Sequence, residues 1–441
     1  MKRYLFALGM TLLASHPVPA GTNESSIGQL GDGSAAEVSQ DSAVSGGLNA
    51  SDIKQTGSGN QAKVNQTFNS IPPFFGDPGS NRSAIEQTGT DNHVQVDQVH
   101  DIFGVGGGSN ISDVIQIGTA NEAEVSQSNV FTYTQSTIDQ NGSDHRASVT
   151  QTGFADSVVS IVEQAGAGQE ATVNQHAVGS PFDALPGFDS RIVQTGFGNK
   201  ASVDQSTNSN GARSTIQQDG TNQSADVHQN GIFLAGESLI SQSGTDNTAL
   251  VKQSGVDQTH LSVIHVDGTS NQTDVLQGYG GGFGPSWYDS LITIEGNGNI
   301  TKVLQDSHDA TISSTVIELG DANTVLVDQN GISGTDVSEV RLDGASNQIS
   351  VKQTVIADND AMNTSRIDVN DAANLIDVEQ NILPADGLAP GARNSSEVQV
   401  DGASNQITVS QDILAAGATG SQNSVIHAVG NGNIINIVQQ Q

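Results

Sequence analysis

The ionisable side chains of this 441-residue chain are the first place to look for chemistry. Its 48 Asp and Glu residues could supply the paired carboxylates of a hydrolase, but they occupy variable positions without a distinctive cluster. Histidines such as His260 and His265 lack the spacing of metal ligands. Acidic turns, as at Asp91 and Asp246, lack the glycine–aspartate nonapeptide of calcium-binding β-rolls. We therefore expect no catalytic residue, no cofactor and no metal ion.

Amides and hydroxyls, in contrast, recur at fixed spacing and could form hydrogen-bonded ladders. The stretch SDIKQTGSGNQAKVNQ, from Ser51 to Gln66, belongs to a pattern that returns sixteen times. Ser opens every unit and Gln closes every unit, from Gln40 to Gln439. The units begin at Ser25, Ser51, Ser83, Ser112, Ser136, Ser160, Ser190, Ser214, Ser238, Ser262, Ser290, Ser314, Ser338, Ser365, Ser396 and Ser424. The chain is a repeat protein.

Each unit predicts two strands joined by a tight turn. The marked positions on both sides of a Gly-x-x-Asn segment alternate with variable polar positions, which is typical of strands with one buried face. Gly occupies the first turn position in fifteen units, with Asp371 in the other, and Asn occupies the fourth position in twelve. Both residues tolerate positive φ, so we expect a sharp chain reversal there.

One such strand–turn–strand arch buries too little apolar surface to be stable alone. Stacking of successive arches solves this problem, since identical side chains then lie about 4.8 Å apart in parallel, in-register sheets. Buried Gln amides in such a stack can bond to one another along its axis. We therefore predict an all-β fold, a single β-solenoid of about sixteen stacked strand–turn–strand repeats.

Two inward positions change together along the chain. In the first nine units the position before the turn is Gln, from Gln29 to Gln242, and its partner after the turn is Ala, except for Val94. In the last seven units both positions are mostly aliphatic or β-branched, with Glu318 as the anomaly, which we expect to be protonated or to lie at an edge. The two positions should touch across the interior, so that residues 21–261 have a Gln/Ala core and residues 262–441 an aliphatic core in one continuous solenoid.

The first twenty residues predict a secretory signal peptide. Lys2 and Arg3 precede an apolar run from Tyr4 to Ala14, and Ala20 ends a small-residue cleavage site. Without this segment the formal charge is 13 minus 48, or −35, which makes nucleic acid an unfavourable partner. No later segment is apolar enough to span a membrane. We expect a secreted, extracellular protein.

The segments between units collect prolines and aromatic residues. Trp287 and Tyr288 could stack on sugars, and Phe74 and Phe75 could anchor a partner, but the simpler expectation is that these rings cover the sheet edges. Only short segments flank the first and last units, so we also expect solenoid ends without caps, which favours end-to-end growth.

The unit Ser-x3-Gln-x-Gly-x-x-Asn-x-Ala-x3-Gln resembles the curlin repeat of bacterial curli subunits. The resemblance implies stacked β-arches that polymerise into extracellular amyloid fibres of a biofilm matrix and support cell adhesion. It also implies a homopolymer with a nucleator and a curli-type secretion system as further partners. The implied ladder and assembly residues are Ser51, Gln55, Gly57, Asn60, Ala62, Gln66, Ser112, Gln116, Asn121, Gln127, Ser190, Gln194, Asn199, Gln205, Ser238, Gln242, Asn247, Gln253 and Gln439.

Three functional hypotheses follow, and they belong to different classes. The first is a structural fibre subunit of the extracellular matrix. The second is a secreted β-solenoid adhesin that does not polymerise and binds glycan or matrix through its linker side. The third is a β-helical enzyme that acts on glycans.

Overall fold

The structure is a computed structural model that describes most of the chain in sixteen segments. These are residues 21–42, 47–70, 79–102, 108–129, 133–154, 157–178, 187–207, 211–231, 235–255, 258–279, 286–308, 311–332, 334–356, 361–383, 391–414 and 420–441. Each segment contains one repeat unit. The predicted signal peptide, Phe74 and Phe75 lie outside the described residues.

Every described segment forms two strands, one on each side of its turn. The first sheet contains β1 (Thr22–Leu30), β3 (Leu48–Ser58), β5 (Ser80–Thr90), β7 (Ser109–Thr119), β9 (Tyr133–Ser143), β11 (Ser157–Ala167), β13 (Phe188–Phe197), β15 (Ala212–Thr221), β17 (Ala235–Thr245), β19 (Gln258–Thr269), β21 (Ser286–Asn297), β23 (Thr311–Leu319), β25 (Thr335–Asp343), β27 (Met362–Asn370), β29 (Arg393–Asp401) and β31 (Ser421–Val429). The second sheet contains β2 (Ala35–Ser42), β4 (Gln61–Ser70), β6 (His93–Ile102), β8 (Glu122–Asn129), β10 (Arg146–Phe154), β12 (Glu170–Val178), β14 (Lys200–Thr207), β16 (Ser224–Asn230), β18 (Thr248–Ser254), β20 (Gln272–Tyr279), β22 (Ile300–His308), β24 (Thr324–Ile332), β26 (Gln348–Ile356), β28 (Leu375–Ile382), β30 (Gln406–Ile413) and β32 (Ile434–Gln440).

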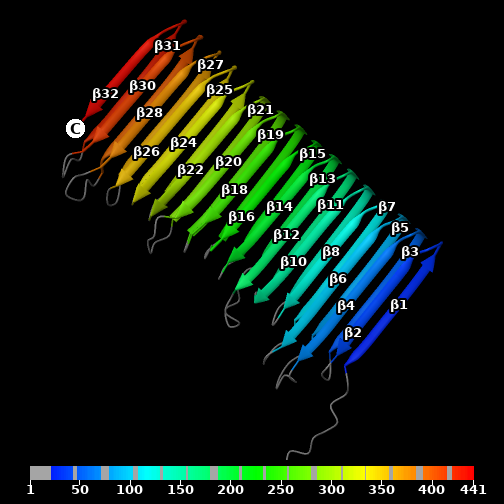
Figure 1. Cartoon of the computed structure of the whole chain (residues 1–441). Coiled ribbons are helices and arrows are strands. Elements are labelled where there is room, and N and C mark those ends of the chain that lie inside the picture. Colours follow the sequence, from blue (N-terminus) through cyan, green and yellow to red (C-terminus); the bar gives the residue numbers. More distant parts are fainter. Residues whose placement is uncertain are drawn as a thin grey trace, which may run out of the picture.

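The two sheets lie face to face and run the length of an elongated molecule, with β1 at one end and β32 near the other (Figure 1). Every pairing is parallel and keeps the repeat in register: Ser25 pairs with Ser51, and Gln55 pairs with Gln87. The predicted all-β solenoid of sixteen in-register coils is thereby confirmed. We call each pair of strands a coil and name it by its opening Ser. No helix that could span a membrane occurs among the described residues.

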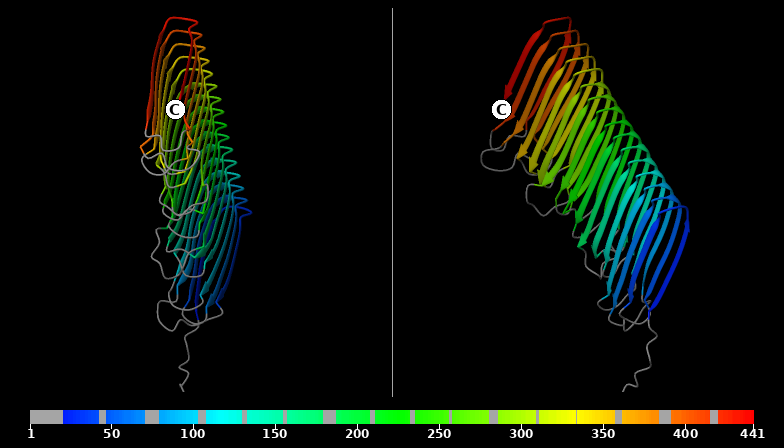
Figure 2. Two further views of the ribbon diagram at one scale, coloured as in Figure 1. Left: turned by 90° about the vertical axis from the view of Figure 1, so that its left-hand side faces the viewer. Right: turned by 45° about the vertical axis from the view of Figure 1, so that its right-hand side comes forward.

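The stack is flat and slightly twisted, and successive coils are displaced along its axis (Figure 2). This arrangement places residues that are 24 to 32 positions apart in the chain directly against each other, as for Gln140 against Gln164 and Gln55 against Gln87. Side chains at one repeat position therefore form a continuous column. These columns are the elements that position the polar groups described below.

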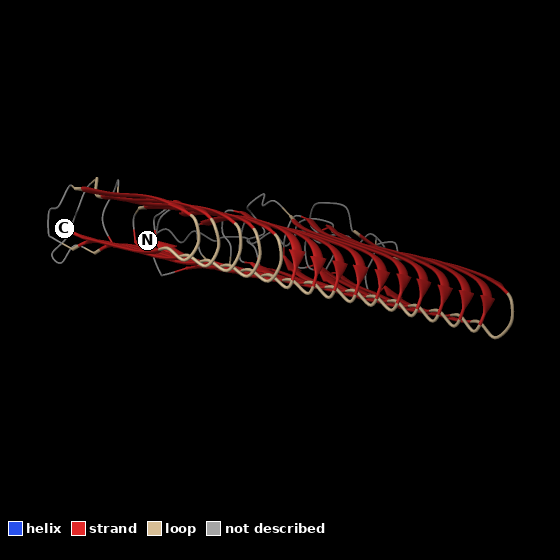
Figure 3. Cartoon of the chain, turned by 90° about the horizontal axis from the view of Figure 1, so that it is seen from above, coloured by secondary structure: helices blue, strands red, loops and turns tan. Residues whose placement is uncertain are grey.

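The turns line up along one edge of the molecule (Figure 3). Their first residue has positive φ in all sixteen coils, for example 113° at Gly57, and a Cβ there would lie 2.0 Å from the Gly89 carbonyl oxygen. The third residue also has positive φ, as at Asp91, where φ is 56°. The expectation that the fourth residue, Asn, supplies positive φ is wrong, because the left-handed step comes one residue earlier.

Between the Ser and the closing Gln of each unit, the interior contains three facing pairs of columns. Ile53 of the first strand and Val64 of the second represent the central pair, and both side chains are fully buried. On the turn side the first-strand Gln or aliphatic column faces the Ala or β-branched column, and on the other side the Ser column faces the closing Gln column. The core is a thin, continuous slab between the sheets.

The strands extend beyond the sixteen-residue unit, which changes the interpretation of several aromatic residues. Phe68, Phe188 and Tyr288 were expected in linkers at the sheet edges, but they lie on strands and are buried between the sheets. Phe68 stacks on His100, with ring centroids 5.1 Å apart. Because strand length is set by what the flanking residues can bury, the repeat unit alone underestimates it.

Candidate functional site: the interior amide ladders

The closing Gln column forms an unbroken ladder along the whole solenoid. The Nε2 group of each Gln donates to Oε1 of the next, over fifteen successive bonds of 2.7–3.1 Å. Its members are Gln40, Gln66, Gln98, Gln127, Gln151, Gln175, Gln205, Gln229, Gln253, Gln277, Gln305, Gln329, Gln353, Gln380, Gln411 and Gln439. All fifteen bonds point from the first coil toward the last, so the ladder has a direction.

The second hydrogen of each of these amides crosses the interior to the opposite sheet. Nε2 of Gln66 donates to the Ala50 carbonyl oxygen at 2.9 Å, and Nε2 of Gln127 donates to Ile111 in the same way. The acceptor is always the backbone carbonyl oxygen of the residue directly before the opening Ser of the same coil. Both amide hydrogens are therefore satisfied, which removes the cost of burying a polar group.

The first-strand Gln column makes a shorter ladder. Eight bonds of 2.6–2.9 Å connect Gln29, Gln55, Gln87, Gln116, Gln140, Gln164, Gln194, Gln218 and Gln242. Their second hydrogens also cross the interior, but to the previous coil, as from Gln55 to the Ala35 carbonyl oxygen at 3.1 Å. The ladder stops at Gln242, since the next residue in the column is Val266, and Nε2 of Gln242 is buried without an acceptor among the described residues.

The turn Asn column makes a third ladder that involves the backbone. Oδ1 of each Asn accepts the N–H of the residue at the same position in the next coil, at 2.9–3.1 Å. Asn60, Asn121, Asn199 and Asn247 all take part, and their Nδ2 groups donate to turn carbonyls such as that of Gly89. This role accounts for Asn at the fourth turn position.

The serines behave differently from the amides. Ser51, Ser112, Ser190 and Ser238 are buried, yet their hydroxyls have no hydrogen-bond partner within the described residues. What these residues provide is small size, because the closing Gln must pass over them to reach the opposite backbone. Ala62 has the same relation to the first-strand Gln column.

In the aliphatic half, Glu318 points inward and is fully buried, with Ile294 and Leu342 before and after it in its column. The edge position that was considered for it is therefore excluded. The Thr301 hydroxyl of the preceding coil donates to Oε1 of Glu318, while Oε2 has no donor among the described residues. Burial raises the pKa of the Glu318 carboxyl to about 7, and the Thr301 hydrogen bond opposes that rise in part.

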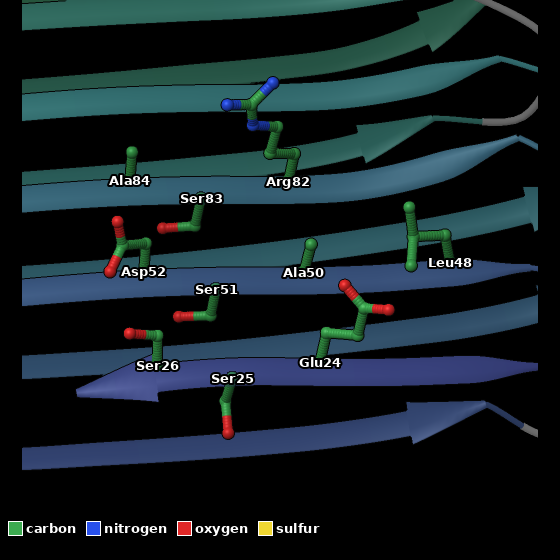
Figure 4. A pocket seen from close by; sticks show the side chains of 10 residues that line it. All are labelled: Glu24, Ser25, Ser26, Leu48, Ala50, Ser51, Asp52, Arg82, Ser83 and Ala84. Carbon is green, nitrogen blue, oxygen red and sulfur yellow. The ribbon is translucent and has the colours of Figure 1, made fainter.

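Among the described residues, no group of three or more His, Asp and Glu side chains could hold a metal ion. Tyr288 is buried, whereas Trp287 is 58% exposed on the outer face of β21. A hollow of about 570 Å³ beside β1, β3 and β5 is lined by Leu48 and by small and charged side chains, including Ser26, Asp52 and Ala84, and by no aromatic ring (Figure 4).

Two features of the site escaped the sequence interpretation. One is a fourth ladder at the open side of the coils, in which Asn49, Asn81 and Asn110 each donate to the preceding Asn. The other is the set of cross-sheet bonds that use the second amide hydrogen. The sequence feature that could have predicted these bonds is the small residue that faces each Gln. The sequence interpretation recognised this pairing for Ala but not for Ser.

The fold and its ladders define a β-solenoid repeat protein with an amide-bonded interior. A scan of protein-family models and a search of curated proteins gave no match to this chain.

Proposed function

We propose that this protein is a structural subunit that polymerises end to end into extracellular fibres. The observation that carries the proposal is the Gln ladder, which has the same bond and the same register at each of its fifteen steps. A ladder of this kind ends in an acceptor, Oε1 of Gln40, at one end and in a donor, Nε2 of Gln439, at the other. A second copy can continue it without any change of geometry.

The outermost strands support this proposal. β1 is exposed along all nine of its residues, and β32 is at most half-buried. Proteins that remain monomeric usually protect such edges with charges. The stretch from Ile413 to Gln441 nevertheless contains no Asp, Glu, Lys or Arg, although the chain has a net charge of −33. The resemblance to curlin repeats favours the same function and an extracellular matrix location.

The direct test is electron microscopy and fibre diffraction of the mature chain at micromolar concentration without seeds. We expect unbranched fibres with a meridional spacing of about 4.7 to 4.8 Å. An Ile437→Lys variant places a charge in the interior of the outermost coil and should prevent fibre growth, while the solenoid remains folded by circular dichroism. Asn436→Lys, on the outward side of the same strand, is the matched control.

Persistent short rods of the unmodified chain would overturn the proposal. The exposed Trp287 would then favour the glycan-binding adhesin, which a glycan array with a Trp287→Ala control can test.

A further inference from the structure

Two carboxyl groups are buried in consecutive coils of the aliphatic half. Glu318 lies on β23 in the Ser314 coil and is 0% exposed, and Asp336 lies on β25 in the Ser338 coil and is 1% exposed. They are the only carboxyl side chains among the buried residues that the structure describes. Neither belongs to a ladder, and the fibre proposal does not use them.

Apart from the Thr301 hydroxyl, the surroundings of Glu318 do not stabilise its ionised form. It packs between β21 and β25 in its own sheet and faces β22 and β24 across the interior. The inward side chains of these four strands are neutral apart from two groups that titrate, Tyr288 and Asp336, and both lie toward the opposite end of their strands from the turn. The charged residues of these strands point outward; they are Asp289, Glu295, Lys302, Asp306, Asp328, Glu339, Arg341 and Asp343.

Asp336 is even less well supplied with donors. It lies between Ile312 and Asn363 in its column, and neither Oδ atom has a hydrogen-bond partner within the described residues. The Asn363 amide is committed elsewhere, since its Nδ2 donates to the carbonyl oxygens of Thr354 and Gln380. Of the inward side chains on β23, β24, β26 and β27, which pack around Asp336, only Glu318 titrates; the outward charged residues there are Asp328, Lys352, Arg366 and Asp368.

We propose that the Ser314 and Ser338 coils form a pH-operated seam, at which the C-terminal part of the solenoid opens from the rest as the pH rises from acidic to mildly alkaline. A buried carboxyl that lacks donors is tolerated only in its neutral form. Deprotonation leaves a buried charge without a cationic partner, and opening of the two coils returns that charge to water. Because the two carboxyl groups lie in consecutive coils, ionisation of either one favours opening of the solenoid at the same place.

The titration of the two groups sets the pH range. Burial raises the pKa of Glu318 to about 7 and that of Asp336 to about 8, although the neighbouring Thr301 hydroxyl and Asn363 amide each oppose the rise in part. The folded state holds these protons more tightly than the open state. The resulting stabilisation of the folded state is therefore complete below the ordinary carboxyl pKa, near 4, and is lost as the pH rises toward the raised pKa values. Between these limits, each group increases the open population about tenfold per pH unit.

Hydrogen exchange followed by mass spectrometry tests the seam on the full mature chain, before any fibre forms. After correction for the intrinsic exchange rate, peptides from β23 to β26 should lose protection between pH 5 and pH 8 far more steeply than peptides from β7 to β10. The Glu318→Leu, Asp336→Asn double variant should remove this difference, since Leu342 shows that Leu fits the same column. Glu339→Gln, an exposed carboxylate on β25, should leave the pH dependence unchanged.

Equal pH dependence in both groups of peptides, or an unchanged slope in the double variant, would overturn the proposal. The measurement needs only the folded solenoid. Failure of the seam is therefore distinguishable from failure to polymerise.

Discussion

The coils before and after residue 262 have the same register, the same turn and the same closing Gln ladder, but they fill the turn side of the interior differently. In the first half, Gln crosses to the opposite backbone beside Ala, and from Gln55 to Gln218 both amide hydrogens find an acceptor. In the second half, pairs such as Leu342 and Ile349 fill the same width with carbon alone. The chemistry of this pair changes, while the in-register pairing of the strands continues across the boundary.

This comparison shows which part of the repeat is interchangeable. The Ser and closing Gln pair persists in all sixteen coils, whereas the second pair tolerates either chemistry. The difference is that the closing ladder bonds within each coil as well as between coils, so it holds the two strands of one arch together. The first-strand Gln column bonds to the previous coil and only supplements the stacking.

The largest effect should come from placing a charge in the closing ladder. Gln66→Glu replaces a donor by a carboxylate beside the Ala50 and Gln98 acceptors, and should cost about 3 to 5 kcal/mol at pH 7, as for other unpaired buried charges. Gln66→Leu loses the same hydrogen bonds without the charge and should cost about 1 to 3 kcal/mol. Urea unfolding of both variants measures the difference. Equal costs would show that Gln66 does not face the interior.

The titration of one buried histidine should affect stability at the boundary between the two halves. His260 is buried in the first coil of the aliphatic half, packs edge-on against Tyr288, and has its pKa lowered by burial to about 4. Because the unfolded chain binds the proton more tightly, His260 should contribute a loss of stability of about 3 kcal/mol as the pH drops from about 6.5 to 4, opposite in sign to the contributions of Glu318 and Asp336. Thermal unfolding of the protein and of His260→Phe across this range isolates the His260 contribution as the difference between the two slopes. An unchanged slope would assign the acid sensitivity to other groups.

A single substitution that introduces a core residue of one half into the other half should reduce the stability of the solenoid. Ala62→Ile adds volume where the Gln87 amide crosses to the Gln61 carbonyl, and should destabilise the solenoid by about 1 to 3 kcal/mol. Adding Gln87→Val in the same chain should recover part of this cost, more than adding Gln55→Val does. Denaturation of the single and double variants measures this coupling, and strictly additive costs would contradict the facing arrangement.

The smallest effect is expected at the end of the shorter ladder. Gln242→Leu removes an amide whose nitrogen has no acceptor in the described structure and leaves one hydrogen of the Gln218 amide unpaired in its place, so it should change stability by less than about 1 kcal/mol. The same substitution at Gln218, which donates to both Gln242 and the Lys200 carbonyl, should cost about 1 to 3 kcal/mol. Chemical denaturation of the two variants checks the ranking, and similar costs would mean that Gln242 has a donor role of its own.

The fold could be predicted from the sequence because its period-two pattern and its repeat agree at every coil. Register followed directly, since the alignment of Ser25 with Ser51 also aligns every inward residue. The direction of the cross-sheet bonds could not be predicted, because Gln55 reaches Ala35 of the previous coil whereas Gln66 reaches Ala50 of its own. The burial of Tyr288 could not be predicted either, because the repeat does not show how far a strand continues beyond the unit into the flanking residues.

The facing of the columns also has a consequence for the symmetry of the coil. Ser51, Ile53 and Gln55 on one strand correspond to Ala62, Val64 and Gln66 on the other: small, branched, amide, in the same order and eleven residues apart. A half-turn about the long axis of the solenoid therefore exchanges two strands of the same pattern. After residue 262 this symmetry is lost, because the amide of the first strand and the small residue of the second are both replaced, while the Ser and the closing Gln remain.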